Sequence, residues 1–169
     1  MRKITIRRLY SKMLSASGLP GRDLWLFAEC WLQLLIVKVA LTAAPRLILK
    51  GSLEAGIDSA VLSNQAEGRL IRVLSIAERN HLVSINCLPR AVTLQRLLRR
   101  RGVSAQLFIG AQKEGRTLNA HAWLQENNRV VNDRPDVAEL FPPLTMGSET
   151  IARWIETAKA ANQLTPTRP

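Results

Sequence analysis

The hydrophobic periodicity of the chain changes at Gly102, and this change restricts the fold classes open to it. Before this glycine, apolar residues recur at helical spacing, as they do over residues 66–80. After it, residues 104–112 and 118–126 alternate in the manner of half-buried strands, and 129–133 follows an Asn-Asn pair typical of a hairpin. Helices followed by an antiparallel sheet predict an α+β fold, and 169 residues suit one domain or a small core with an appended segment.

The strongly apolar run at residues 24–49 predicts a long helix near the N-terminus. Asp23 suits the positive end of a helix dipole, and Pro45 disfavours helix in the residue before it, so the helix should end near Ala44. Residues 50–59 carry two glycines and two serines and are predicted to form a linker.

This apolar run is not interpreted as a signal peptide or a membrane span. Glu29 and Lys38 interrupt it, and charges near a bilayer centre cost about 2.5 kcal/mol or more on insertion scales. We therefore predict two parts, a helical region over 1–60 that faces a partner or a membrane, and a core over 61–169. Peripheral membrane contact stays open.

Charge and cysteine content limit the partners and the compartment. The net charge of +11 suggests an acidic partner, although a basic solvated surface explains it equally well. Aromatic residues make up only 5% of the chain and no nucleic-acid motif accompanies the charge, so we predict no nucleic-acid partner. Two cysteines without a CxxC pair argue against a disulfide framework and a zinc site, which predicts no metal, no cofactor and a cytoplasmic location.

Cys87 is the candidate nucleophile. It precedes Pro89 at the start of a predicted helix that runs to Arg101, and proline is tolerated in a first turn. The positive end of the helix dipole favours a thiolate, which is the reactive form of cysteine. A lone apolar-flanked cysteine is more often a small core residue, so the interpretation needs a base and a carboxylate.

His121 and Asp133 are the candidates for these two roles. His121 alternates with alanines in "NAHAW", and a hairpin at Asn127–Asn128 would bring Asp133 back beside it. A carboxylate there would fix the imidazole tautomer and stabilise its charged form. Cys30, within the apolar helix, and His81, at a predicted helix end, are interpreted as structural.

The segments "CLPRAVTLQRLLRRRGVSAQLFIG", "AHAW" and "RVVND" resemble the lasso-peptide leader peptidases, which are transglutaminase-like cysteine proteases. The resemblance covers roughly residues 66–145. It implies a transglutaminase- or papain-like core, in which a helix bearing Cys87 packs on a small sheet bearing His121 and Asp133. It also implies that these three residues form a catalytic triad.

The resemblance further implies a substrate and partners. Such enzymes remove the leader from a lasso-peptide precursor, and the freed amine is then cyclised by a separate lasso cyclase. Because residues 1–60 lack the short alternating strands of a fused recognition domain, we expect a stand-alone peptidase that uses a separate leader-recognition protein. The basic N-terminus and "RLLRRRG" are candidates for docking an acidic leader or that protein, although "RLLRRRG" also suits a solvated helix end.

Two other functions stay open at the sequence level. A thioester on Cys87 can pass its acyl group to an amine, as in transglutaminase-like acyl transfer, and the product mass would distinguish transfer from hydrolysis. The chain can also be a non-catalytic basic module that binds a precursor peptide. In that case Cys87 would react with alkylating agents no faster than a model thiol.

Overall fold

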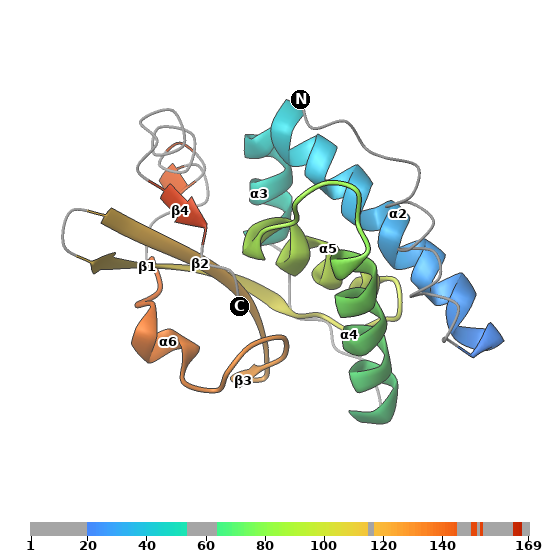
Figure 1. The fold of residues 1–169 in the computed structure, drawn as a ribbon. Coiled ribbons are helices and arrows are strands. Elements are labelled where there is room, and N and C mark those ends of the chain that lie inside the picture. The colour runs from blue at the N-terminus through green and yellow to red at the C-terminus, as the bar shows by residue number, and fades with distance from the viewer. Residues whose placement is uncertain are drawn as a thin grey trace.

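The structure, a computed structural model, describes residues 20–53, 64–114, 117–144, 150–151, 153 and 164–166. A group of helices packs beside a small sheet, as Figure 1 shows. In chain order the elements are α2 (Gly21–Ala43), α3 (Pro45–Leu53), α4 (Asn64–Arg79), α5 (Cys87–Arg99), β1 (Gln106–Glu114), β2 (Thr117–Glu126), β3 (Arg129–Val130), α6 (Val137–Leu140) and β4 (Leu164–Pro166). This order confirms the predicted α+β class, and the helix predicted over 66–80 is α4.

Helix α5 is the centre of the fold. It contacts α2 on one side and strands β1 and β2 on the other. Its residues Ala91, Val92, Leu94 and Leu97 are fully buried in one hydrophobic cluster that also includes residues of α2, α4 and both long strands. Burial of this kind stabilises a fold by about 25 cal/mol per Å² of apolar surface, so α5 holds its first residue firmly against the sheet.

Strands β1 and β2 form a long antiparallel hairpin, and β3 continues the sheet on the other edge of β2. Asn127 and Asn128 both have positive φ, 47° and 63°, as a two-residue type I′ hairpin requires. Strand β3 is shorter than the predicted 129–133 and covers only residues 129–130. The final "TPTRP", residues 165–169, is typical of a tail, but Thr165 and Pro166 belong to β4, which pairs parallel with β2.

The predicted linker over 50–59 is wrong for its first four residues. Helix α3 runs from Pro45 through Leu53, so the glycine and serine at 51 and 52 are helical. Pro45 occupies the first helical position, where its missing N–H has no partner to lose. The remainder of the linker, and the boundary at residue 60, fall in residues 54–63, outside the described residues. The two-part division of the chain therefore stays a prediction.

Helix α2 is apolar on both faces. Cys30, Leu34, Val37 and Leu41 are buried, whereas Trp25 is 82% exposed on the outer face, where Leu32, Ile36 and Val39 are also exposed. Within the described residues it is the one helix with the length and apolarity to cross a bilayer, a property that core helices of soluble proteins share.

Ion pairs also attach α2 to its neighbouring helices. Asp23, which is fully buried, accepts hydrogen bonds from Arg69 at 2.6 Å and Arg72 at 3.1 Å on α4. Glu29 pairs with Arg101, just beyond α5, at 2.8 Å. These contacts orient the inner face of α2 toward the core. Near the C-terminus, the spacing of Ile151, Trp154 and Ile155 predicts an amphipathic helix over 148–163. Most of this segment lies outside the described residues, and Ile151 is buried.

Candidate active site

Cys87 is the first residue of α5, as the sequence predicted. Asn86 precedes it in extended conformation, and the N–H of Arg90 closes the first turn on the Asn86 carbonyl at 3.2 Å. The half-buried thiol donates to the carbonyl of Ala120 on β2, with a sulfur–oxygen distance of 3.9 Å. The backbone N–H of Cys87 belongs to the first turn, whose N–H groups have no acceptor within their own helix.

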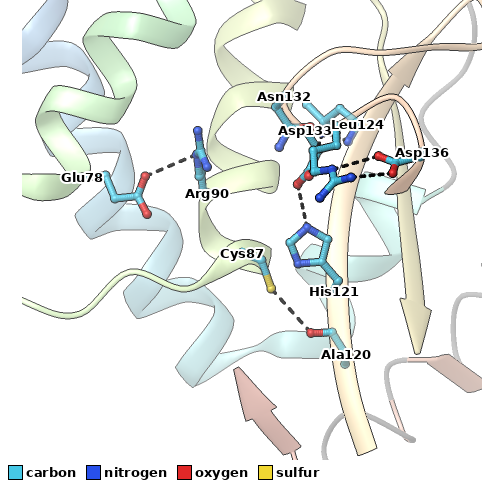
Figure 2. Close-up of polar contacts among 10 residues, drawn as sticks. Glu78, Cys87, Arg90, Ala120, His121, Leu124, Asn132, Asp133 and Asp136 are labelled. Carbon is cyan, nitrogen blue, oxygen red and sulfur yellow. Dashed lines mark hydrogen bonds and ion pairs between the residues drawn. The ribbon is translucent and has the colours of Figure 1, made fainter. Parts of the chain in front are cut away.

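His121 on β2 lies between the thiol and Asp133, as Figure 2 shows. Its Nε2 donates to Asp133 Oδ2 at 2.6 Å, and its side chain is only 8% exposed. Because Asp133 occupies Nε2, Nδ1 is the ring nitrogen available to Cys87. The structure therefore brings together all three residues that the sequence singled out.

The loop after β3 holds the Asp133 carboxylate in place. Asn132 is buried, and its Oδ1 accepts the N–H of Leu124 on β2 at 2.7 Å. The N–H of Val131 donates to the Leu124 carbonyl at 3.0 Å, which extends the pairing beyond β3. Asp133 Oδ1 accepts the N–H of Arg134 at 2.8 Å, which leaves Oδ2 for His121. A one-residue shift of this loop would separate the pair.

Electrostatics favours the charged form of this pair. Burial lowers the pKa of His121, but the hydrogen bond with Asp133, together with the one with Cys87 and the charges of both residues, raises it to about 9. Burial raises the pKa of Asp133, and the hydrogen bonds from His121 and from the Arg134 N–H reverse this effect, so its pKa lies below the usual 3.8. An imidazolium beside a carboxylate is thus the stable state near neutral pH. It is the partner that a thiolate needs.

Arg90 is a component of the site that the sequence analysis did not identify. Its Nε lies 3.3 Å from Glu78 Oε2 on α4, and its Nη2 donates to Ser75 Oγ at 3.2 Å. Its positive charge also contributes to the lowered pKa of Asp133. Figure 2 shows it between Glu78 and Asp133. The signal was present in "CLPR", because a residue three positions after Cys87 shares its helix face.

Phe141 covers the imidazole, which is a second contact that the sequence analysis missed. The ring of Phe141 lies 5.0 Å from that of His121, and the backbone at 141 crosses directly over Gly110. Gly110 pairs with His121 across the hairpin, and a Cβ at this position would collide with the Phe141 carbonyl and with Trp123. The available signal was a glycine inside a strand, which often marks a close backbone approach.

The competing residues have structural environments. Cys30 is fully buried, and burial raises the pKa of its thiol to about 12. His81 is 3% exposed and stacks on Trp31, its Nδ1 accepts the N–H of Val83 at 3.3 Å, and its Nε2 faces the Trp31 carbonyl at 3.2 Å. The described residues contain no group of three or more His, Cys, Asp or Glu side chains suited to holding a metal ion.

Comparison with known proteins agrees with this geometry. The microcin J25-processing protein McjB of Escherichia coli is 28% identical over 90 residues, which cover 46% of this chain and 42% of that protein. The match thus spans less than half the length of that relative. No solved structure matches the chain. The family model described as the transglutaminase-like superfamily matches residues 31–146, which include Cys87, His121 and Asp133, so the chain belongs to the transglutaminase-like superfamily.

Proposed function

We propose that this chain is a cysteine peptidase that cleaves the leader from a lasso-peptide precursor through a thioester on Cys87. The observation that carries the proposal is the proximity of three groups. They are the half-buried thiol of Cys87 at the start of α5, the buried imidazole of His121 on β2, and the carboxylate of Asp133 in the loop after β3. Each residue type has a distinct role in acyl transfer: a nucleophile, a proton carrier and a group that orients the carrier.

The first half of the reaction forms the thioester. The Cys87 thiolate attacks the carbonyl carbon at the junction of leader and core, so that a C–S bond forms and the carbonyl oxygen becomes an oxyanion. The backbone N–H of Cys87 is positioned to donate to this oxyanion. When the C–N bond breaks, His121 transfers a proton to the departing nitrogen, and the core peptide leaves with a free α-amine.

The second half releases the leader. Neutral His121 accepts a proton from water, the resulting hydroxide attacks the thioester, and the C–S bond breaks to restore the thiolate and the imidazolium. The net reaction consumes one peptide bond and one water. Asp133 orients the imidazole and stabilises its charge throughout, without taking up the proton itself.

The substrate and partners are inferred from the relative and from the sequence. Similarity to a protein named for processing microcin J25 supports a role in lasso-peptide maturation. We expect a separate leader-recognition protein to present the precursor, and the lasso cyclase to use the new amine. A reaction that needs a free thiol suits the reducing cytoplasm, and neither Cys30 nor Cys87 is in a disulfide.

The test is incubation of the protein with its cognate precursor, with and without the recognition protein, followed by mass spectrometry. We expect a free leader acid and a core peptide from wild type and from Cys30→Ala, and no cleavage by Cys87→Ala. An adduct of the leader with an added amine would assign acyl transfer instead. Normal cleavage by Cys87→Ala would refute the proposed nucleophile.

A further inference from the structure

A cavity of about 350 Å³ opens between α3 and the C-terminal half of α5, and we call it the α3–α5 groove. Leu47 and Ile48 of α3 line one side, and Arg96 and Arg99 of α5, followed by Arg100, line the other. A second cavity of similar volume adjoins it at Leu47 and is lined by Arg46, Lys50 and Arg153. Within the described residues, neither lining includes a carboxylate. The groove therefore presents apolar side chains on its α3 side and positive charge on its α5 side.

The four arginines between positions 96 and 101 divide into two groups by their partners. Arg100 and Arg101 both face Glu29, at 3.5 Å and 2.8 Å. Arg101 also donates to the Leu97 carbonyl at 2.8 Å, which satisfies the C-terminal end of α5. The side chains of Arg96 and Arg99, by contrast, have no ion pair or hydrogen bond with any described residue. Within the described part of the chain, no contact occupies their guanidinium groups, and an external anion can pair with them.

The floor of the groove is held by buried contacts. Gln95 is 4% exposed, and its amide nitrogen donates both to the Ser52 carbonyl at 2.8 Å and to the Ala105 carbonyl at 2.9 Å. These bonds join the end of α3, the middle of α5 and the approach to β1. Leu47, at 73% exposed, stands above this floor. A preformed groove with an exposed leucine suits a peptide that carries an apolar side chain between carboxylates.

The groove lies well away from Cys87. At about 1.5 Å per residue along α5, Arg96 and Arg99 are roughly 14 Å and 18 Å from the thiol-bearing end of the helix. An extended peptide covers at most about 3.3–3.6 Å per residue, so it needs at least about four to six residues to connect the two places. A ligand in the groove therefore contacts a part of the peptide that is remote from the cleaved bond.

We propose that the α3–α5 groove binds an acidic segment of the precursor peptide, at least about four residues away from the bond that Cys87 cleaves. This inference rests on the proposed function for the identity of the peptide. Two guanidinium groups beside leucine favour a peptide over single-stranded nucleic acid, because the described lining offers no aromatic side chain on which a base could stack.

The test measures binding directly, without catalysis. The probe is a fluorescein-labelled peptide of about 15 residues with several glutamates around one leucine, long enough to cross the groove. Its Kd for the full chain is measured by fluorescence anisotropy, beside a second peptide with glutamine at every glutamate. The groove variant is Arg96→Glu with Arg99→Glu. The control, Arg22→Glu with Arg79→Glu, makes the same charge change at two exposed arginines outside the groove.

We expect the groove variant to weaken binding about tenfold at low salt and the control about twofold, since only the groove variant reverses charges that contact the ligand. Leu47→Ser should weaken binding severalfold without changing charge. The proposed binding site would be refuted if both double variants lost the same affinity for the glutamate peptide, or if wild type bound the glutamine peptide as tightly as the glutamate peptide. Tighter binding of single-stranded DNA or phosphatidylserine vesicles, lost in the groove variant alone, would overturn the peptide assignment.

Precursor cleavage by the same variants separates this inference from the proposed function. If the groove binds the precursor, the groove variant should have a raised KM. Its kcat should be unchanged, because Arg96 and Arg99 are remote from Cys87. If wild type cleaves the precursor and the groove variant has the same KM as wild type, the proposed binding site is refuted and the proposed peptidase activity is not. Absence of cleavage by wild type, together with groove-dependent binding of the acidic probe, would refute the peptidase and leave the groove intact.

Discussion

Replacing Asp133 by asparagine tests the electrostatic coupling within the site. The substitution keeps the shape of the side chain and removes the charge that lies 2.6 Å from His121 Nε2. The pKa of His121 is raised from 6.5 to about 9 in the folded protein, a difference that corresponds to about 3 kcal/mol in favour of the imidazolium. The Asp133 hydrogen bond is the largest of the effects that raise it.

Without that carboxylate, burial of the ring should dominate and return the pKa of His121 to about 6.5 or below. At about pH 7.5 the ratio of imidazolium to imidazole should fall from roughly 30:1 to roughly 1:10. The proposed mechanism uses the imidazolium both as the partner of the thiolate and as the acid for the leaving amine, so kcat/KM should fall by about 10² or more.

The assay is an NMR titration of the histidine rings. The chain contains only two histidines, so the ring signals of His121 are identified as those that are lost in His121→Gln. Asp136→Asn is the matched control: it makes the same chemical change three residues away, where the carboxylate pairs with exposed Arg134. An unchanged His121 titration in Asp133→Asn, or a wild-type pKa near 6.5, would refute the reasoning.

Two further predictions concern stability. Gly110→Ala should lower the free energy of unfolding by about 2 kcal/mol and displace Phe141, because the new methyl group meets the Phe141 backbone and Trp123. Gly68→Ala in α4, where a Cβ meets nothing within 4 Å, should instead stabilise by up to about 1 kcal/mol; urea denaturation of both variants checks the contrast. The raised pKa of His121 should add stability that is complete below about pH 6.5 and is lost as the pH rises through about 9. Urea titrations should show this loss in wild type but not in His121→Gln, and equal pH dependence in both would contradict it.

Much of the site was predictable because its signals are local. Cys87 beside Pro89 indicates a helix start, and the adjacent asparagines at 127 and 128 indicate a two-residue hairpin, so the approach of Asp133 to His121 followed from chain geometry. The early end of β3 did not change this outcome, because Asn132 continues the attachment to β2 through its side chain rather than its backbone. Strand propensity alone does not reveal that a side-chain hydrogen bond takes the place of a backbone hydrogen bond.

The features that were missed depend on tertiary contacts. The contact of Arg90 with Glu78 joins two helices, and the crossing of residue 141 over Gly110 joins a loop to a strand. Helix α3 includes a glycine and a serine of weak helix propensity, yet it is held by the burial of Leu49 and by the Gln95 bond to Ser52. Local sequence does not specify these partners, so the same residues predict a linker when taken alone.

The reactivity of Cys87 toward iodoacetamide near neutral pH is the most direct test of the central claim, that its thiol is coupled to His121 and Asp133. Cys30 provides the comparison within the same molecule, since it is fully buried and its pKa is raised to about 12. Peptide mapping by mass spectrometry should show Cys87 alkylated much faster than Cys30 in wild type, and strongly slowed in His121→Gln. Equal rates at the two cysteines, or a Cys87 rate unaffected by His121→Gln, would contradict the claim.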